Sequence, residues 1–158
     1  MTHGLGAELI ALARATMAAA QFDCPLVETD AQAEPFSSSV TFKNQHAIVD
    51  FVYDGLERHF SCTLSLWRRN VDPPDPCRGT QFVVAQIPVA LLDLSVAKPN
   101  CYPTDVKTAV PYWTRLLEQH GQDLLSGDFQ GLHYRKRDLL RSDRSELGTY
   151  GEDPDEQD

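Results

Sequence analysis

The sequence HAIVDFVYDGLERHFSCTLSLW, residues 46–67, decides the fold. Its second half alternates strictly between polar residues and four apolar ones: Phe60, Cys62, Leu64 and Leu66. Such alternation is typical of a strand with one buried face and one solvated face. Asp54-Gly55 divides the segment, and this dipeptide tolerates the positive φ angles of a type I′ turn. The segment therefore predicts two antiparallel strands joined by a tight hairpin.

One further strand is predicted on each side of this hairpin. Residues 38–43 (SSVTFK) alternate in the same way and precede a turn at Asn44-Gln45. Residues 81–87 form a fourth strand after a loop that is rich in proline. Residues 21–36 are interpreted as a connection, with a short strand near Leu26-Val27 left open as an alternative. Because short connections favour neighbouring antiparallel strands, the prediction is a four-stranded meander.

The segments before and after the strands have helical patterns. Residues 5–20 place apolar side chains at roughly helical spacing in an alanine-rich background. A second helix is predicted to begin at a cap provided by Thr104 or Thr108 and to extend to about Leu125, and a third covers residues 128–143. The predicted class is α+β, with an N-terminal helix, the meander, and C-terminal helices packed on one face of the sheet.

The composition predicts one folded domain without a membrane segment. A chain of 158 residues that is 42% hydrophobic has enough apolar side chains for a core. We place the domain at residues 1–145 and interpret residues 146–158 as an acidic, disordered tail. No apolar run approaches the roughly 20 residues of a membrane span, and the start lacks the basic residues of a secretion signal. The predicted location is the cytoplasm.

The net charge of −9 favours a basic protein as partner over a nucleic acid. Proteins that bind nucleic acids neutralise phosphates with Lys and Arg, which are outnumbered here by Asp and Glu. Complementary charge between two proteins, in contrast, speeds their encounter.

The four cysteines indicate neither a metal site nor a cofactor. None forms a C-x-x-C pair, and none has a histidine at ligand spacing. Cys62 is predicted in the core because it lies on the apolar face of its strand. Cys77 and Cys101 lie in proline-containing loops and are interpreted as candidate exposed thiols.

Histidines and carboxylates near the central hairpin leave an enzymatic alternative open. His46 and His59 are expected near the ends of adjacent strands, and Asp50, Asp54 and Glu57 are close in sequence. A histidine beside a carboxylate can act as acid or base. The alternative is a small hydrolase or transferase that uses His59 and one of these carboxylates.

The long loop after the central hairpin is a candidate interaction segment. Trp67, Arg68, Arg69 and Arg78 flank it, and Trp and Arg are residue types that often dominate interface energies. Long loops in small domains frequently carry function.

The order of these segments resembles that of small acidic bacterial immunity-type proteins, which neutralise polymorphic toxins. The resemblance lies in the N-terminal helix, the meander VTFKNQHAIVDFVYDGLERHFSCTLSL (residues 40–66) and the helical segment WTRLLEQHGQDLLSGDFQGL (residues 113–132). It implies a protein-binding inhibitor that blocks a basic toxin's active site, with acids that could mimic phosphates if the toxin is a nuclease. It transfers no functional residue, because no motif defines it.

The predicted partner-binding residues are therefore the acids of the meander together with the acids, the tryptophan and the arginines of the long loop: Asp50, Asp54, Glu57, Trp67, Arg68, Arg69, Asp72, Asp75 and Arg78. A third alternative is a structural subunit of a larger assembly. The identity of the partner and the oligomeric state are left open.

Overall fold

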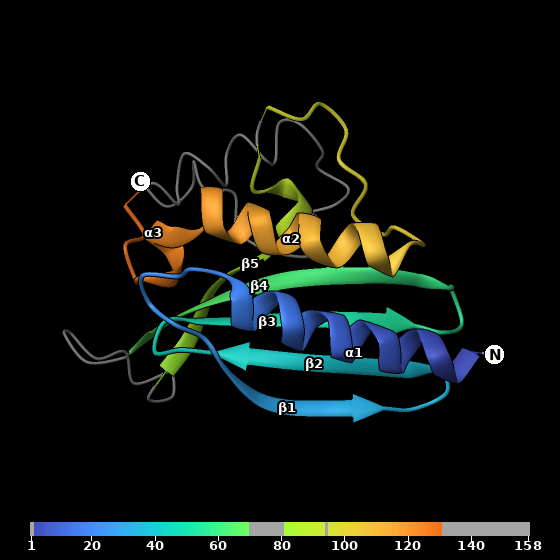
Figure 1. The fold of residues 1–158 in the computed structure, drawn as a ribbon. Coiled ribbons are helices and arrows are strands. Elements are labelled where there is room, and N and C mark those ends of the chain that lie inside the picture. The colour runs from blue at the N-terminus through green and yellow to red at the C-terminus, as the bar shows by residue number, and fades with distance from the viewer. Residues whose placement is uncertain (1, 70–80, 94, 131–158) are drawn as a thin grey trace.

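The protein folds as a five-stranded antiparallel sheet with two long helices on one of its faces (Figure 1). The computed structural model describes residues 2–69, 81–93 and 95–130. The strands pair in sequence order: β1 (Val27–Ala33), β2 (Ser37–Lys43), β3 (Ala47–Asp54), β4 (His59–Arg69) and β5 (Gln81–Pro88). The helices are α1 (Thr2–Ala19), the 3₁₀ turn η1 (Val89–Leu91), α2 (Val106–His120) and α3 (Gln122–Leu125).

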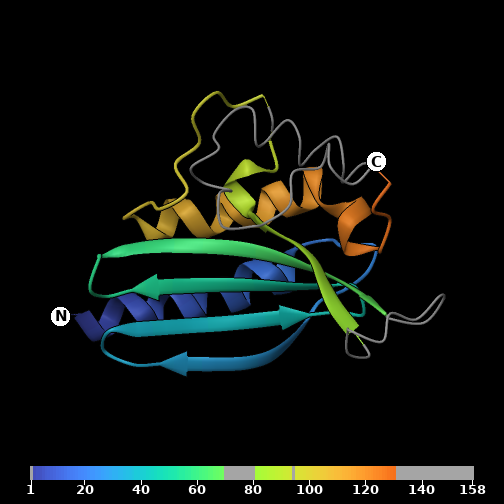
Figure 2. The same cartoon turned by 180° about the vertical axis from the view of Figure 1, so that it is seen from behind.

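The core lies between the sheet and the two long helices. The predicted apolar face of β4 is confirmed, because Phe60, Cys62, Leu64 and Leu66 are all buried. On β3, buried and half-buried residues alternate along the whole strand. Helix α1 packs on β1, β2 and β3, while α2 packs on α1 and β4. Seen from behind, the other face of the sheet has no described helix over it (Figure 2).

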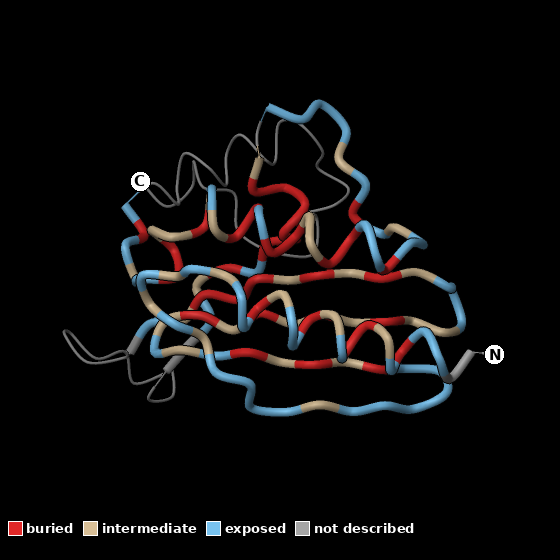
Figure 3. Tube along the Cα trace, viewed as in Figure 1, coloured by how far each residue is buried: buried red, intermediate tan, exposed pale blue. Residues whose placement is uncertain are grey.

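The prediction of four strands is wrong by one, because residues 27–33 form the edge strand β1. Six of its seven residues are exposed, and its register against β2 shifts between Glu28 and Asp30. Its side chains bury little surface, so β1 is held mainly by backbone hydrogen bonds to β2. Such a strand needs no alternation of apolar and polar residues in the sequence. Its place at the edge is visible in the tube, where β1 is almost entirely exposed (Figure 3).

The type I′ hairpin predicted at Asp54-Gly55 is also wrong. Asp54 pairs with His59, so four residues form the turn, and the positive φ falls at Arg58 (57°) instead. The carboxylate of Asp54 accepts hydrogen bonds from the backbone N–H groups of Leu56 (3.0 Å) and Glu57 (3.2 Å). These hydrogen bonds stabilise the four-residue turn, so the chain does not need a two-residue type I′ turn at Asp54-Gly55.

The helices differ from prediction mainly at their ends. Helix α1 begins at Thr2, three residues early, and α2 is capped by Asp105, whose carboxylate accepts from the backbone N–H of Lys107. The predicted capping residue Thr108 takes part only by donating its hydroxyl to Asp105 at 2.7 Å. The predicted helix over residues 128–143 lies beyond the described residues from 131 onward, as does the acidic tail.

Gly127 ends the helical segment in a conformation that requires glycine. Its φ is +88°, and a Cβ built there would lie 2.7 Å from Nδ1 of His46. We expect Gly127→Ala to lower the free energy of unfolding by about 2 kcal/mol, since both the left-handed backbone and the contact are unfavourable. Urea denaturation measures this. Adding His46→Ala to the same chain should recover only the stability that is lost through the contact with the His46 ring. Wild-type stability of Gly127→Ala alone would contradict the expectation.

The described cysteines should differ in reactivity. Cys62 is buried as predicted, and burial, followed by the charge of Asp50, raises the pKa of its thiol well above the usual value. Cys101 is buried too, so the prediction of an exposed thiol is wrong for it, because its segment packs onto β4. Cys77 lies outside the described residues.

We expect iodoacetamide at mildly alkaline pH to label Cys24, which is half-buried, and to spare Cys62 and Cys101 until the chain is unfolded. Peptide mass spectrometry identifies each labelled site. Labelling of Cys62 in the folded chain at the rate of Cys24 would rule out this burial.

Candidate functional site

The predicted acids of the meander lie on β3 and on the turn that follows it. Asp50 lies on the helix-free face, where its carboxylate accepts a hydrogen bond from the hydroxyl of Thr41 on β2 at 2.5 Å. Asp54 ends the strand, four residues or about 13 Å further along. Glu57 is exposed in the turn. Asp54 and Glu57 are therefore close together at one end of the sheet, while Asp50 lies nearer its middle.

The residues predicted around the long loop lie at the opposite end of the sheet. Trp67 pairs with Val83 of β5 there. The guanidinium of Arg68 lies 5.2 Å from the centre of the Phe129 ring, so it is engaged within the chain. Only the backbone of Arg69 is described, and Asp72, Asp75 and Arg78 lie outside the described residues.

The structure therefore does not bring the predicted partner-binding residues into one surface. Strand β4 has 11 residues, so its two ends are roughly 35 Å apart. Its first residue, His59, pairs with Asp54, whereas Trp67 and Arg68 are near its last. The reason is that residues adjacent to a hairpin and residues adjacent to the next loop occupy opposite ends of an antiparallel strand.

The histidine and carboxylate pair of the enzymatic alternative is not formed. His46 precedes β3 and His59 begins β4, so the two histidines lie at opposite ends of the sheet. The Nδ1 atom of His59 is buried without a hydrogen-bond partner, and the ring lies 4.9 Å from that of Tyr102. The carboxylate of Asp54 is engaged by its own turn. Across the described residues, no cluster of histidine, cysteine and carboxylate side chains could hold a metal ion.

What the structure does bring together is a pair of turns with exposed apolar tips. The backbone N–H of Gly55 donates to the carbonyl oxygen of Phe36 at 3.0 Å, which joins the β3–β4 turn to the β1–β2 turn. A Cβ on Gly55 would lie 2.9 Å from the carbonyl oxygen of Pro35, so only glycine permits this approach. Phe36 is 63% exposed and Leu56 is 76% exposed.

A third exposed ring reaches the same end of the sheet. The N–H of Phe60 donates to the carbonyl oxygen of Pro103 at 2.9 Å, because β5 does not extend along the first residues of β4. This bond places the neighbouring Tyr102, which is 49% exposed, against His59. We call the surface made by Phe36, Leu56 and Tyr102, with the acids Glu34, Asp54 and Glu57, the hairpin end.

Large exposed apolar side chains concentrate at the hairpin end. The start of α1, with the half-exposed Leu5, lies at this end as well (Figure 1). By contrast, Val27, the first residue of β1, and Val83, near the start of β5, lie at the far end of the sheet on its two edge strands. Clustered apolar side chains on a surface are typical of interaction sites, whereas scattered ones are ordinary.

The charges around these apolar side chains are mainly negative. Glu34, Asp54 and Glu57 contribute three carboxylates, and Arg58 contributes a guanidinium. The Asp54 carboxylate is held by backbone N–H groups, while Glu57 is exposed and free to meet a partner in solvent. An apolar centre with a polar rim is the usual anatomy of a protein interface, and here the rim is acidic.

Sequence reasoning missed Phe36, Leu56 and Tyr102, although it predicted Asp54 and Glu57. The sequence pattern places Phe36 in a predicted connection and Leu56 inside a predicted turn, and neither position is expected to be functional. The available signal was an apolar residue at the tip of a hairpin, where polar residues are the norm.

Comparison of the chain with protein-family models, with curated proteins and with solved structures found no match. Within the described ranges, no helix has the length and apolar character needed to cross a membrane.

Proposed function

We propose that this chain is a protein-binding module, an immunity-type inhibitor that uses the hairpin end to block the active site of a basic toxin. The observation that supports the proposal is the pairing of Phe36 and Leu56, both largely exposed, on two turns that are hydrogen-bonded to each other. Leaving such side chains in water brings no benefit to the isolated chain. Burying them against a partner is favourable by about 1.5–3 kcal/mol for each fully buried side chain.

The tips are well suited to binding because their backbone is already ordered. The β3–β4 turn is held by the Asp54 carboxylate and by the bond from Gly55 to Phe36. A partner that meets fixed side chains does not have to order a loop, and this reduces the entropic cost of association.

The acidic rim favours a basic partner. Carboxylates at Glu34, Asp54 and Glu57 would face the cations of an active site that handles anionic substrates. If the target is a nuclease, these carboxylates would occupy the positions of phosphates. Association should then slow markedly as salt is raised, since exposed charges are screened beyond about 10 Å at moderate ionic strength.

The test begins with the tagged full chain as bait in a lysate of its native host, followed by expression of the captured protein in an unrelated host. We expect a basic partner that arrests growth alone and is harmless when this chain is co-expressed. A chain with Phe36→Ser and Leu56→Ser should fail to protect, while Val27→Ser should protect fully.

Two results would overturn the proposal. One is a captured protein with no toxic activity. The other is full protection by the chain that carries both substitutions at the hairpin end, since it would place the inhibitory surface elsewhere.

A further inference from the structure

Strand β1 has a free edge that runs along the outside of the sheet. It is the first strand in the sheet order, and both views show no described element on its outer side (Figure 1 and Figure 2). Among the described residues, Val27–Ala33 makes no backbone hydrogen bond outside its pairing with β2. The outward N–H and C=O groups of such a strand are a template on which another extended chain can pair.

The second half of β1 is regular enough to accept an added strand. Residues 30–33 pair in unbroken register with residues 38–41 of β2, and the irregularity of β1 lies before them. Three of these four residues are exposed and two are alanines, so no bulky side chain covers the backbone. The strand is also held by α1, because the guanidinium of Arg14 donates to both carboxylate oxygens of Glu28, at 2.7 and 2.8 Å. An added strand therefore meets an edge that is already ordered, which lowers the entropic cost of binding.

The side chains along this edge are acidic. Three carboxylates, Glu28, Asp30 and Glu34, lie on β1 or directly after it, and no lysine or arginine occurs between Arg14 and Lys43. Arg14 pairs with Glu28, whereas Asp30 and Glu34 form no ion pair with a described residue. These two carboxylates are therefore available to the cations of a partner.

Asp30 is placed to face a residue of an added strand. It pairs with Thr41, whose hydroxyl donates to Asp50, so Asp30 lies on the same helix-free face of the sheet. Its carboxylate lies 3.5 Å from the side-chain amide of Gln32, a long contact that leaves most of its lone pairs free. A residue directly opposite Asp30 on an added strand would lie about 5 Å away, a spacing at which opposite charges stabilise strand pairs and like charges destabilise them.

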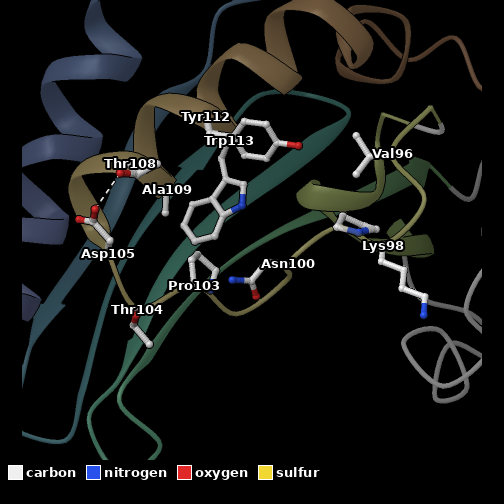
Figure 4. Close-up of a pocket in the computed structure, with 11 residues that line it drawn as sticks. Val96, Lys98, Asn100, Pro103, Thr104, Asp105, Thr108, Ala109, Tyr112 and Trp113 are labelled. Carbon is white, nitrogen blue, oxygen red and sulfur yellow. Dashed lines mark hydrogen bonds between the residues drawn. The ribbon is translucent and has the colours of Figure 1, made fainter.

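A cavity of about 460 Å³ beside α2 lacks such a directed set of charges (Figure 4). The ammonium of Lys98 points away from Trp113 and Asn100 there (Figure 4). The carboxylate of Asp105 accepts from the hydroxyl of Thr108 at 2.7 Å and serves the helix cap. The charged groups of the lining therefore do not converge on one ligand group.

We propose that the outer edge of β1 binds an extended basic peptide segment by strand addition, with a lysine or arginine opposite Asp30. The backbone of residues 30–33 supplies the hydrogen bonds, and the carboxylates of Asp30 and Glu34 select a basic segment over an acidic one. A second copy of this chain is disfavoured, because pairing two β1 edges would bring acidic side chains together. The proposal does not require the partner proposed for the hairpin end.

The test is an NMR titration of the isotope-labelled full chain with the capped peptide acetyl-TKVKVKT-amide. We expect saturable shifts of the backbone amides of Val27–Ala33, and slower solvent exchange of those amides that face the free edge. The acidic peptide acetyl-TEVEVET-amide should show no saturable binding. The basic peptide with two adjacent central residues N-methylated keeps its charge but loses a backbone donor on each side, so it should bind at least tenfold more weakly.

Two matched variants separate the charge of β1 from the charge of the whole chain. Asp30→Asn should weaken binding of the basic peptide about fivefold, because it removes the carboxylate that faces the added strand. Asp128→Asn removes an exposed carboxylate after α3 and keeps an oxygen for the N–H of Gln130, so it should leave the affinity unchanged. The spectra of the free variants show whether each is folded.

Absence of saturable binding of the basic peptide would overturn the proposal. Equal affinity for the N-methylated peptide would do the same, because charge alone would then explain the binding. So would shifts centred outside β1, or equal affinities of Asp30→Asn and Asp128→Asn for the basic peptide. Because no titration contains the partner proposed for the hairpin end, each of these failures would leave the inhibitor proposal untouched.

Discussion

Replacing Phe36 and Leu56 together by serine should weaken binding of the proposed protein partner by about a hundredfold, with almost no change in the stability of the free chain. Interface residues of this kind cost roughly 2 kcal/mol or more when truncated, and each 1.4 kcal/mol is a factor of ten. The stability of the free chain should hold because both side chains are already largely in water, at 63% and 76% exposure. The measurement is surface-immobilised binding of the captured partner, together with urea denaturation of the free variant.

The matched control is Val27→Ser at the far end of the sheet. Val27 is 66% exposed, so the change removes a comparably exposed apolar side chain without touching the hairpin end. Its affinity for the partner should equal that of the wild type. If the two substitutions at the hairpin end and Val27→Ser weaken binding equally, the loss comes from general surface change and the hairpin end is not the interface.

The weaker binding expected for the variant with Phe36→Ser and Leu56→Ser should appear mainly as faster dissociation of the complex. Truncated apolar contacts change how long a complex lasts, whereas rim charges change how fast it forms. Glu57→Lys should therefore slow association and reduce its salt dependence while leaving dissociation less affected. The two classes of variant separate the apolar centre of the hairpin end from its acidic rim.

The sequence was sufficient for the parts of the fold in which burial imposes a period. The alternation through Phe60 and Leu64 predicted β4 and its buried face, and the α+β class followed from the order of the segments. The full length of strand β1 could not be predicted, because an edge strand that buries almost nothing needs no alternation of polar and apolar side chains. The hairpin turn was misassigned because the Asp54 carboxylate can stabilise several turns, and sequence does not say which.

The candidate site was only half predictable for a related reason. Asp54 and Glu57 lie within four positions of each other in the sequence, so the local sequence is sufficient to predict that these two acids are close together. Phe36 reaches the same surface through a hydrogen bond to Gly55, 19 positions away in sequence numbering, and Tyr102 through Pro103. Such contacts depend on strand register and on where β5 ends, and a single sequence carries no direct signal of either.

Gly6→Ala should destabilise the protein, although alanine is the better helix former. A Cβ on Gly6 would fall within contact distance of the Oγ and Cβ atoms of Ser38, with 2.7 Å to the latter, and the Tyr53 ring lies just beyond. Ser38 is only 2% exposed and its hydroxyl donates to the carbonyl oxygen of Glu34, so it has no free space into which to move. Helix α1 would have to shift off the sheet, which costs about 2 kcal/mol in typical overpacked cores.

Gly4→Ala, two residues earlier in the same helix, is the control for this substitution. Nothing lies within 4 Å of a Cβ built on Gly4, so only helix propensity acts there, and the change should be neutral or stabilising by up to about 1 kcal/mol. The same propensity gain applies to Gly6, so the difference between the two variants in urea denaturation isolates the steric cost at the contact of α1 with β2. Equal stabilities would mean that α1 does not pack this closely on Ser38. A large difference with unchanged partner affinity would show that the hairpin end keeps its shape without the precise seating of α1, because the bond from Gly55 to Phe36 joins its turns independently of the helix.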